Sequence, residues 1–180
     1  MINEGRPAML QQDNYSQTEL DAMFSVVNMS TMQLPQAEMR MIDRIVHVSS
    51  TGGRYNKGEL IAEYDIHPDL WFFKCHFPGD PVMPGCLGVD ALWQGLGFYL
   101  AWAGFKGKGR ALGIGDVRFF GEVSPTAKTV RFHIHMRRII HKDMVLGIAD
   151  GDVYVDGKHI YSCKKIKTGL ISTSSINAIN

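Results

Sequence analysis

The sequence has few cysteines and no excess of either charge. It has three cysteines, an odd number, in 180 residues: Cys75, Cys86 and Cys163. The N-terminus lacks the basic residues followed by an apolar segment that are typical of a secretory signal peptide. This excludes a disulfide-rich secreted scaffold and favours free thiols in a reducing cytoplasm. Lys and Arg total 19 against 18 Asp and Glu. The chain therefore has no overall field that would draw it onto nucleic acid or an anionic membrane, and a charged partner requires a local patch.

A long uninterrupted apolar run is also missing. The longest mainly apolar stretch covers residues 86–105, but it contains Asp90, Gln94 and four glycines. Polar residues of this kind are costly in a bilayer. The stretch is predicted to be a buried helix in a protein that is not inserted in a membrane.

The length is typical of one domain. Residues 1–15 mix Asn, Gln, Gly and Pro without periodicity, and we expect them to form a flexible N-terminal arm before a single domain over residues 16–180. Ser16 and Glu19 have the spacing of a capping box and precede Leu20. A short amphipathic helix is predicted to begin there.

The remainder of the chain predicts one long helix and about six strands. The helix begins after Gly85 and ends near Gly104, and it is apolar nearly all the way round, so it must be surrounded by protein. The strands alternate apolar and polar residues, as a sheet with one wet face requires. Asp156-Gly157 is a two-residue hairpin signal. The predicted strands are residues 41–48, 59–66, 111–120, 129–140, 144–155 and 159–170.

These elements predict an α+β fold in which an antiparallel sheet curls around the long helix. Both the helix and the apolar face of the sheet must be buried, and each can bury the other. This is the hot-dog arrangement.

The segment between residues 75 and 94 is predicted to hold the chemistry. The segment from His76 to Gly85 contains three prolines and two glycines, which force a stiff, irregular loop that positions the histidine. Free backbone N–H groups and the positive end of the helix dipole gather at Gly85 and Cys86, where they could polarise a carbonyl oxygen.

Asp90 lies one turn further into the helix, about 7 Å along its axis from Gly85. A three-carbon reacting unit spans a comparable distance. A carboxyl in an apolar helix is costly unless it is paired or protonated, and a protonated Asp90 could act as a general acid. The other interpretation is a buried aspartate that caps a backbone group.

These residues resemble the bacterial 3-hydroxydecanoyl-acyl-carrier-protein dehydratase/isomerase family of unsaturated fatty-acid synthesis. The likeness covers roughly residues 36–170 and includes residues 70–73, 107–113 and 155–157 besides the central segment. Related dehydratases without isomerase activity carry glutamate at the position of Asp90, so aspartate favours the bifunctional enzyme. The chain departs from the family at Lys74, where glycine is expected, and in its longer N-terminal arm.

The resemblance implies that His76 is the base that takes the C2 proton and that Asp90 protonates the departing C3 hydroxyl. Gly85 would offer its amide to the thioester oxygen, and Cys86, Phe77 and Val82 are assigned to the same oxyanion and substrate-binding region. A neutral imidazole near pH 7 suits both the dehydration and the isomerisation. The family also implies a cytoplasmic homodimer with two interfacial sites, no metal and no cofactor beyond the carrier-borne substrate.

Other interpretations of the cysteines and histidines are weaker. Cys75 beside His76, or Cys86 at a helix start, could be a nucleophile, but both are more simply small residues lining the site. The same three residues lack the paired spacing of a zinc site. His133 and His135 alternate with the apolar face of a strand and are expected to face solvent or a dimer edge.

Basic residues form a local patch that could dock the acidic acyl carrier protein. The alternative is an ordinary solvated face. The residues assigned to docking are Arg137, Arg138, Lys142 and Lys167, with Lys164 and Lys165 nearby.

Three competing functions remain open from the sequence. One is a dehydratase without isomerase activity, the second is a hot-dog thioesterase, and the third is a non-catalytic acyl-binding module. The Pro- and Gly-rich loop that bears His76 weighs against the thioesterase. The presence of both His76 and Asp90 weighs against the non-catalytic module.

Overall fold

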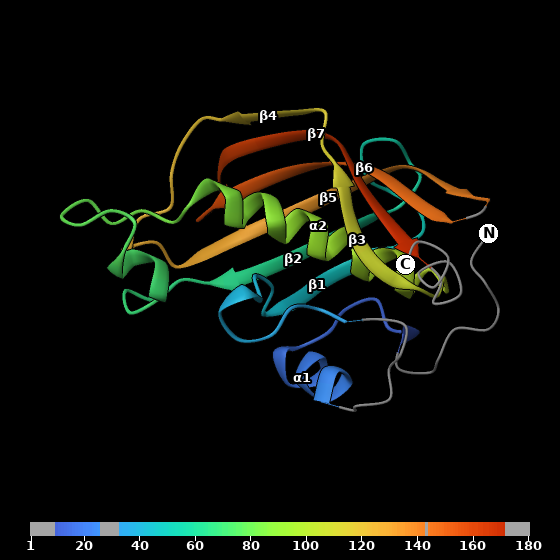
Figure 1. The fold of residues 1–180 in the computed structure, drawn as a ribbon, viewed down its shortest axis with the longest axis horizontal. Helices are drawn as coiled ribbons and strands as arrows, with labels where there is room; N and C mark the ends of the chain where they lie inside the picture. The colour runs from blue at the N-terminus through green and yellow to red at the C-terminus, as the bar shows by residue number, and fades with distance from the viewer. Residues whose placement is uncertain (1–9, 26–32, 143, 172–180) are drawn as a thin grey trace, which may run out of the picture.

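The computed structural model describes residues 10–25, 33–142 and 144–171. A seven-stranded antiparallel sheet has the order β1-β2-β5-β6-β7-β3, and β4 pairs with β7. Helix α2 lies along one face of this sheet, and α1 lies on the β1 side (Figure 1). The predicted sheet around one long helix is therefore confirmed. The elements are α1 (Gln17–Ser25), η2 (Ala37–Met39), β1 (Arg44–Ser49), β2 (Glu59–Asp65), η3 (Trp71–Lys74), α2 (Gly85–Trp102), β3 (Lys108–Gly113), β4 (Asp116–Phe119), β5 (Thr129–His141), β6 (Val145–Val155) and β7 (Lys158–Ile171).

Helix α2 approaches the sheet closely through two of its glycines. A β-carbon at Gly88 would lie 2.5 Å from the Tyr161 ring, and one at Gly95 would lie 2.4 Å from the end of Ile134. Most of the 18 residues of the helix are buried, as its apolar composition predicts. Among the described residues, no helix is both long and apolar enough to span a membrane.

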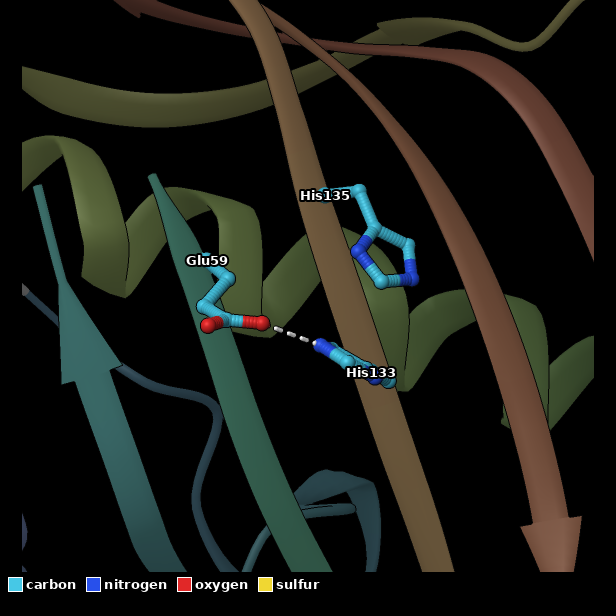
Figure 2. A group of neighbouring side chains, drawn as sticks. All are labelled: Glu59, His133 and His135. Atoms are coloured by element: carbon cyan, nitrogen blue, oxygen red, sulfur yellow. Dashed lines mark hydrogen bonds and ion pairs between the residues drawn. The ribbon is translucent and has the colours of Figure 1, made fainter. Parts of the chain in front are cut away.

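Strand β5 shows how the sheet separates two environments. Phe132, Ile134 and Met136 are buried in the core, whereas His133 and His135 project from the face away from α2 (Figure 2). Successive side chains of a strand point to opposite faces. The face that contacts α2 is called the inner face below, and the opposite face is called the outer face.

The sheet has seven strands rather than about six, because the strand predicted over residues 111–120 is interrupted. Gly113 has a φ of +151°, and the Gly115 amide donates to the Lys164 carbonyl over 2.9 Å. A β-carbon at Gly115 would lie 3.1 Å from the same oxygen. The chain therefore bends between β3 and β4. Among the described strands only β7 pairs with β4, and Phe119 and Phe120 beside it are exposed.

The N-terminal segment is attached to β1 from residue 10 onward. The predicted capping box is confirmed. The Ser16 amide donates to the Glu19 carboxylate over 2.8 Å, and the Glu19 amide donates to the Ser16 hydroxyl oxygen over 3.3 Å. Tyr15 exchanges two backbone hydrogen bonds with Ile45, of 2.7 and 2.9 Å, and Leu10 is buried. Residues 10–15, which the sequence assigned to a flexible arm, thus pack on the sheet. Residues 1–9 lie outside the described residues.

The predicted hairpin at Asp156-Gly157 is confirmed. Both residues have positive φ, +47° and +84°, which is the conformation that two-residue hairpin turns require. The Asp156 carboxylate also accepts the Lys128 and Thr129 amides over 3.1 and 3.0 Å. The turn is therefore bonded to the start of β5.

Candidate active site

The loop between η3 and α2 is held at both ends by backbone hydrogen bonds. The His76 amide donates to the Phe72 carbonyl over 2.8 Å, and the Met83 amide donates to Val123 over 3.0 Å. Phe77 and Asp80 exchange backbone hydrogen bonds of 2.9 and 3.0 Å across a tight turn. Gly79, with a φ of +83°, supplies the left-handed conformation of that turn. The His76–Phe77 peptide bond is cis.

The side chain of His76 is held in one tautomer. Its Nδ1 lies 2.9 Å from the Val82 carbonyl oxygen, and a carbonyl can only accept, so Nδ1 carries the proton of the neutral ring. The lone pair is then on Nε2. The loop therefore presents His76 as a base through a defined atom.

The start of α2 lies beside this histidine and presents free donors. Neither the Gly85 amide nor the Cys86 amide donates to a described residue, and the Leu87 amide turns back to the Pro84 carbonyl over 3.0 Å. A β-carbon at Gly85 would lie 2.7 Å from the Phe119 ring. A larger residue here would have to displace the Phe119 ring. The Gly85 amide is free, among the described residues, to bind an oxyanion.

A cavity of about 640 Å³ brings most of the predicted site residues together. Four of the residues that the sequence assigned to the site line it, namely His76, Val82, Gly85 and Cys86. The other lining residues were not predicted, and most are apolar or aromatic. They are Met83, Val89, Trp93, Val117, Phe119, Gly121, Glu122 and Tyr161. A cavity of this size and apolar character suits an acyl chain.

Two predicted residues do not line this cavity of the single chain. Asp90 is not among its lining residues, and neither is Phe77. The Phe77 ring is 54% exposed and lies with its centroid 3.9 Å from that of the His76 ring. The Phe77 ring thus lies against one face of the histidine ring.

Asp90 is held by a buried glutamine that the sequence did not single out. Gln94 Nε2 donates to Asp90 Oδ2 over 2.6 Å and to the Met39 carbonyl over 2.8 Å, and its Oε1 accepts the Met41 amide over 3.0 Å. Three partners of defined donor or acceptor character fix the orientation of the amide. Gln94 therefore fixes Oδ2 of Asp90 as a hydrogen-bond acceptor.

The basic residues assigned to carrier docking are not equivalent. Arg137 binds Asp150 through two hydrogen bonds of 2.6 and 2.8 Å and lies 4.5 Å above the Tyr55 ring. Its charge is therefore already paired. Arg138, Lys142 and Lys167 are exposed. Arg138 and Lys167 both face Ile148 across neighbouring strands, so they lie in one row on one face of the sheet.

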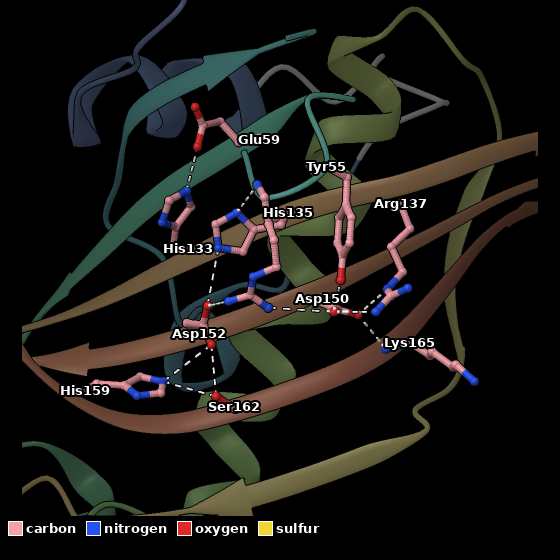
Figure 3. Close-up of polar contacts among 11 residues, drawn as sticks. Tyr55, Glu59, His133, His135, Arg137, Asp150, Asp152, His159, Ser162 and Lys165 are labelled. Carbon is pink, nitrogen blue, oxygen red and sulfur yellow. Dashed lines mark hydrogen bonds and ion pairs between the residues drawn. The ribbon is translucent and has the colours of Figure 1, made fainter. Parts of the chain in front are cut away.

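The outer face carries a polar network that the sequence did not predict (Figure 3). Two members of this network, Asp150 and Asp152 on β6, are almost fully buried. His135, expected to face solvent or a dimer edge, is buried, with Nε2 3.3 Å from Asp152. The reason is the turn over residues 51–58, whose Arg54 amide donates to His135 Nδ1 over 3.2 Å.

Charges and hydrogen bonds keep the two buried carboxylates ionised. Burial alone would raise the pKa of Asp152, but hydrogen bonds from His135 and Ser162 and the charge of Arg54 outweigh it and lower the pKa. Burial is likewise outweighed at Asp150, where hydrogen bonds from Arg137 and Tyr55 lower the pKa. Both acids are therefore anions near neutral pH.

The sheet curled around one buried helix defines a hot-dog protein, and solved structures show the same fold. A chain of the dehydratase heterocomplex ApeI:P from Xenorhabdus doucetiae is similar with a TM-score of 0.63 and 15% identity, covering 81% of this chain and 93% of that chain. A hypothetical thioesterase from Streptococcus pneumoniae, solved with coenzyme A, has a TM-score of 0.51 and 8% identity, over 71% and 84% of the two chains. These identities establish the fold alone.

The family model described as a FabA-like domain matches residues 34–164. This range contains the loop, α2 and every residue that lines the cavity. The chain belongs to the family of FabA-like domains.

Proposed function

We propose that this protein is a 3-hydroxyacyl-thioester dehydratase. The observation that carries the proposal is the geometry of the cavity. It combines a histidine whose Nε2 holds the lone pair, two amides at the start of α2 that bond to none of the described residues, and an apolar wall. Membership of the FabA-like family supports the same class of reaction.

The dehydration follows from these groups. The Gly85 amide binds the thioester oxygen, which acidifies the C2 proton by stabilising the enolate-like charge. His76 Nε2 removes that proton, and the C2 electron pair forms the double bond to C3. Asp90 gives its proton to the C3 hydroxyl, which leaves as water. The trans-2-enoyl thioester remains, and the proton on His76 returns to Asp90 through solvent.

We propose that the same base then isomerises the product. His76 would take a proton from C4 and return one to C2, which moves the double bond to a cis-3 position. The aspartate at position 90 and the extent of the family resemblance support this step. An acyl chain of about ten carbons is the substrate length that the resemblance implies.

A homodimer would complete the site. Asp90 does not line the cavity that holds His76, and β4 leaves a free strand edge next to exposed aromatic residues. Both observations support a two-fold assembly in which each site combines His76 of one chain with Asp90 of the other.

The acidic carrier protein is the proposed source of the substrate. Arg138, Lys142 and Lys167 have exposed charges that could meet it, whereas the charge of Arg137 is paired with Asp150. Docking through such surface charges would act mainly on the association rate and would weaken with salt.

The test is to incubate the purified protein with a ten-carbon 3-hydroxyacyl thioester and identify the products over time. Formation of trans-2-enoyl and then cis-3-enoyl thioester is expected. If trans-2 product alone accumulates at long times, the isomerase proposal fails and the dehydratase proposal stands. Release of free thiol without enoyl product would indicate a thioesterase instead, and no turnover would indicate a binding module.

A further inference from the structure

The outer face of the sheet carries a group of metal-binding side chains away from the cavity. Glu59 on β2 and His133 and His135 on β5 each offer a ligand atom, and these atoms lie within 4.8 Å of one another (Figure 2). Glu59 pairs with His135 across the two strands. The three side chains therefore converge from two neighbouring strands.

The spacing of the donors is close to that of a tetrahedral site. Ligand bonds of about 2.0–2.1 Å to Zn²⁺ place tetrahedral donors roughly 3.4 Å apart. His133 Nε2 now lies 2.6 Å from Glu59 Oε2, while the widest separation in the group is below 4.8 Å. Shifts of about an ångström would open the short contact and close the long one. Such shifts are within reach of side-chain rotation at the surface.

His135 has the tautomer that a metal ligand requires. Its Nδ1 accepts the Arg54 amide over 3.2 Å, so Nδ1 holds the lone pair and Nε2 holds the proton. An ion at Nδ1 would displace this amide. Nε2 is 3.3 Å from the Asp152 carboxylate. A histidine that binds a metal commonly donates its other N–H to a carboxylate, which fixes its tautomer and orientation. Figure 2 shows Nδ1 on the side of the ring that faces Glu59 and His133.

The Asp152 carboxylate that anchors His135 is itself held firmly. Its Oδ1 accepts the Ser162 hydroxyl over 2.9 Å, and its Oδ2 bonds to Arg54. His159 lies 3.4 Å from Oδ1. These contacts form a second layer of support behind the histidine (Figure 3).

Glu59 and His133 are the more exposed members of the group. The side chains of Glu59 and His133 are 18% and 23% exposed, so an ion can reach them from solvent. His47 Nε2, 3.8 Å from Glu59 Oε1, is a further imidazole at this open side.

We propose that Glu59, His133 and His135 bind one divalent transition-metal ion of the class that prefers imidazole and carboxylate ligands, and we choose Zn²⁺ as the probe. The ion would join β2 to β5 beneath the turn over residues 51–58. It would be separated from the cavity by the sheet, so it is independent of the proposed dehydratase activity.

The experiment uses untagged, full-length protein dialysed against a chelator and titrated with ZnCl₂ in a calorimeter. One ion per chain is expected. Because an ion that binds only the folded state stabilises it, the unfolding midpoint should rise with Zn²⁺ concentration. Co²⁺ in place of Zn²⁺ should give visible ligand-field bands from the bound ion.

Variants at the proposed ligands test the assignment. Glu59→Gln and His133→Asn should each weaken binding by more than about tenfold. Both positions are partly exposed, so the variants should fold, and circular dichroism checks this.

Two controls separate the site from its surroundings. His141→Asn removes an exposed imidazole on β5, six residues beyond His135, and Cys75→Ser/Cys86→Ser removes thiols near the cavity. Both should bind Zn²⁺ like the wild type. The proposal is wrong if the wild type takes up no stoichiometric Zn²⁺, if folded Glu59→Gln and His133→Asn bind it unchanged, or if a control variant loses it equally.

Discussion

Gln94 offers a direct test of how Asp90 is positioned. Replacing it with leucine keeps the approximate volume of the side chain but removes all three of its hydrogen bonds. Asp90 Oδ2 loses the donor that lies 2.6 Å away, and the carboxyl can then rotate. The Met41 amide loses its acceptor at 3.0 Å in a fully buried position.

The magnitude of both effects can be worked out. A buried N–H without a partner costs about 1–3 kcal/mol, so Gln94→Leu should lower the free energy of unfolding by about 2–3 kcal/mol. For a chain of this size the midpoint should fall by roughly 5–10 °C. A well-placed general acid contributes about 10²–10⁴ to the rate. Partial loss of its orientation should lower kcat roughly 10- to 100-fold with little change in KM.

The assay measures enoyl thioester formation well below the unfolding midpoint of every variant. Leu100→Ala is the matched control, since Leu100 is fully buried but lies ten residues from Asp90, about 15 Å along the helix. It should lose about 2–5 kcal/mol of stability and keep its kcat. A wild-type kcat in Gln94→Leu, or an equal loss in Leu100→Ala, would refute the positioning role.

Three further predictions follow from other parts of the molecule. Inactive His76→Ala and Asp90→Asn proteins, denatured and refolded together, should recover roughly a quarter of wild-type activity if sites are shared, by the symmetry count for random pairing. No recovery despite proven heterodimers would contradict sharing. Reversing the charge at Arg138 and Lys142 should raise KM for the carrier-bound substrate and reduce the salt dependence of that KM. Turnover of a small thioester analogue should be unaffected. Equal losses of activity on both substrates would mean that these residues support the fold instead of carrier docking. Because the folded-state pKa of Asp152 is lowered from an unfolded value of about 3.9, its carboxylate stabilises the fold above that pH and this contribution disappears on acidification. The free energy of unfolding, measured in urea between about pH 6 and 3, should therefore fall less steeply with acidification in Asp152→Asn than in the wild type. The same pH dependence in both proteins would contradict this role of Asp152.

The parts of the molecule that the sequence predicted are those with strong local signals. The density of Pro and Gly after His76 can only form an irregular loop. Helix α2 is apolar on nearly every side, so it must be enclosed. Asp156-Gly157 has the composition of one turn type. Each signal lies within a few residues, and no knowledge of distant contacts is needed to interpret it.

The parts that were missed depend on residues far apart in the chain. Gln94 bonds to the backbone at Met39 and Met41, 55 and 53 residues away, and no local pattern reveals such partners. His135 looked like an exposed residue of an amphipathic strand. The Arg54 backbone, 81 residues earlier, covers it, and burial followed from that contact rather than from periodicity.

Among the described strands only β7 pairs with β4, and the other edge of β4 has a consequence for the single chain. An unpaired strand edge is a template on which any extended chain can pair, and it therefore promotes aggregation. Asp116 and Arg118 put opposite charges on this edge, 3.0 Å apart. In a two-fold antiparallel pairing centred on Val117, Asp116 would face the partner subunit's Arg118, so the charges match for a second copy of the same chain. A foreign apolar strand would bury both charges and offer neither of them a new partner beyond the ion pair that they already form. The charges on this edge therefore oppose pairing with other apolar strands more than pairing with a second copy of the chain.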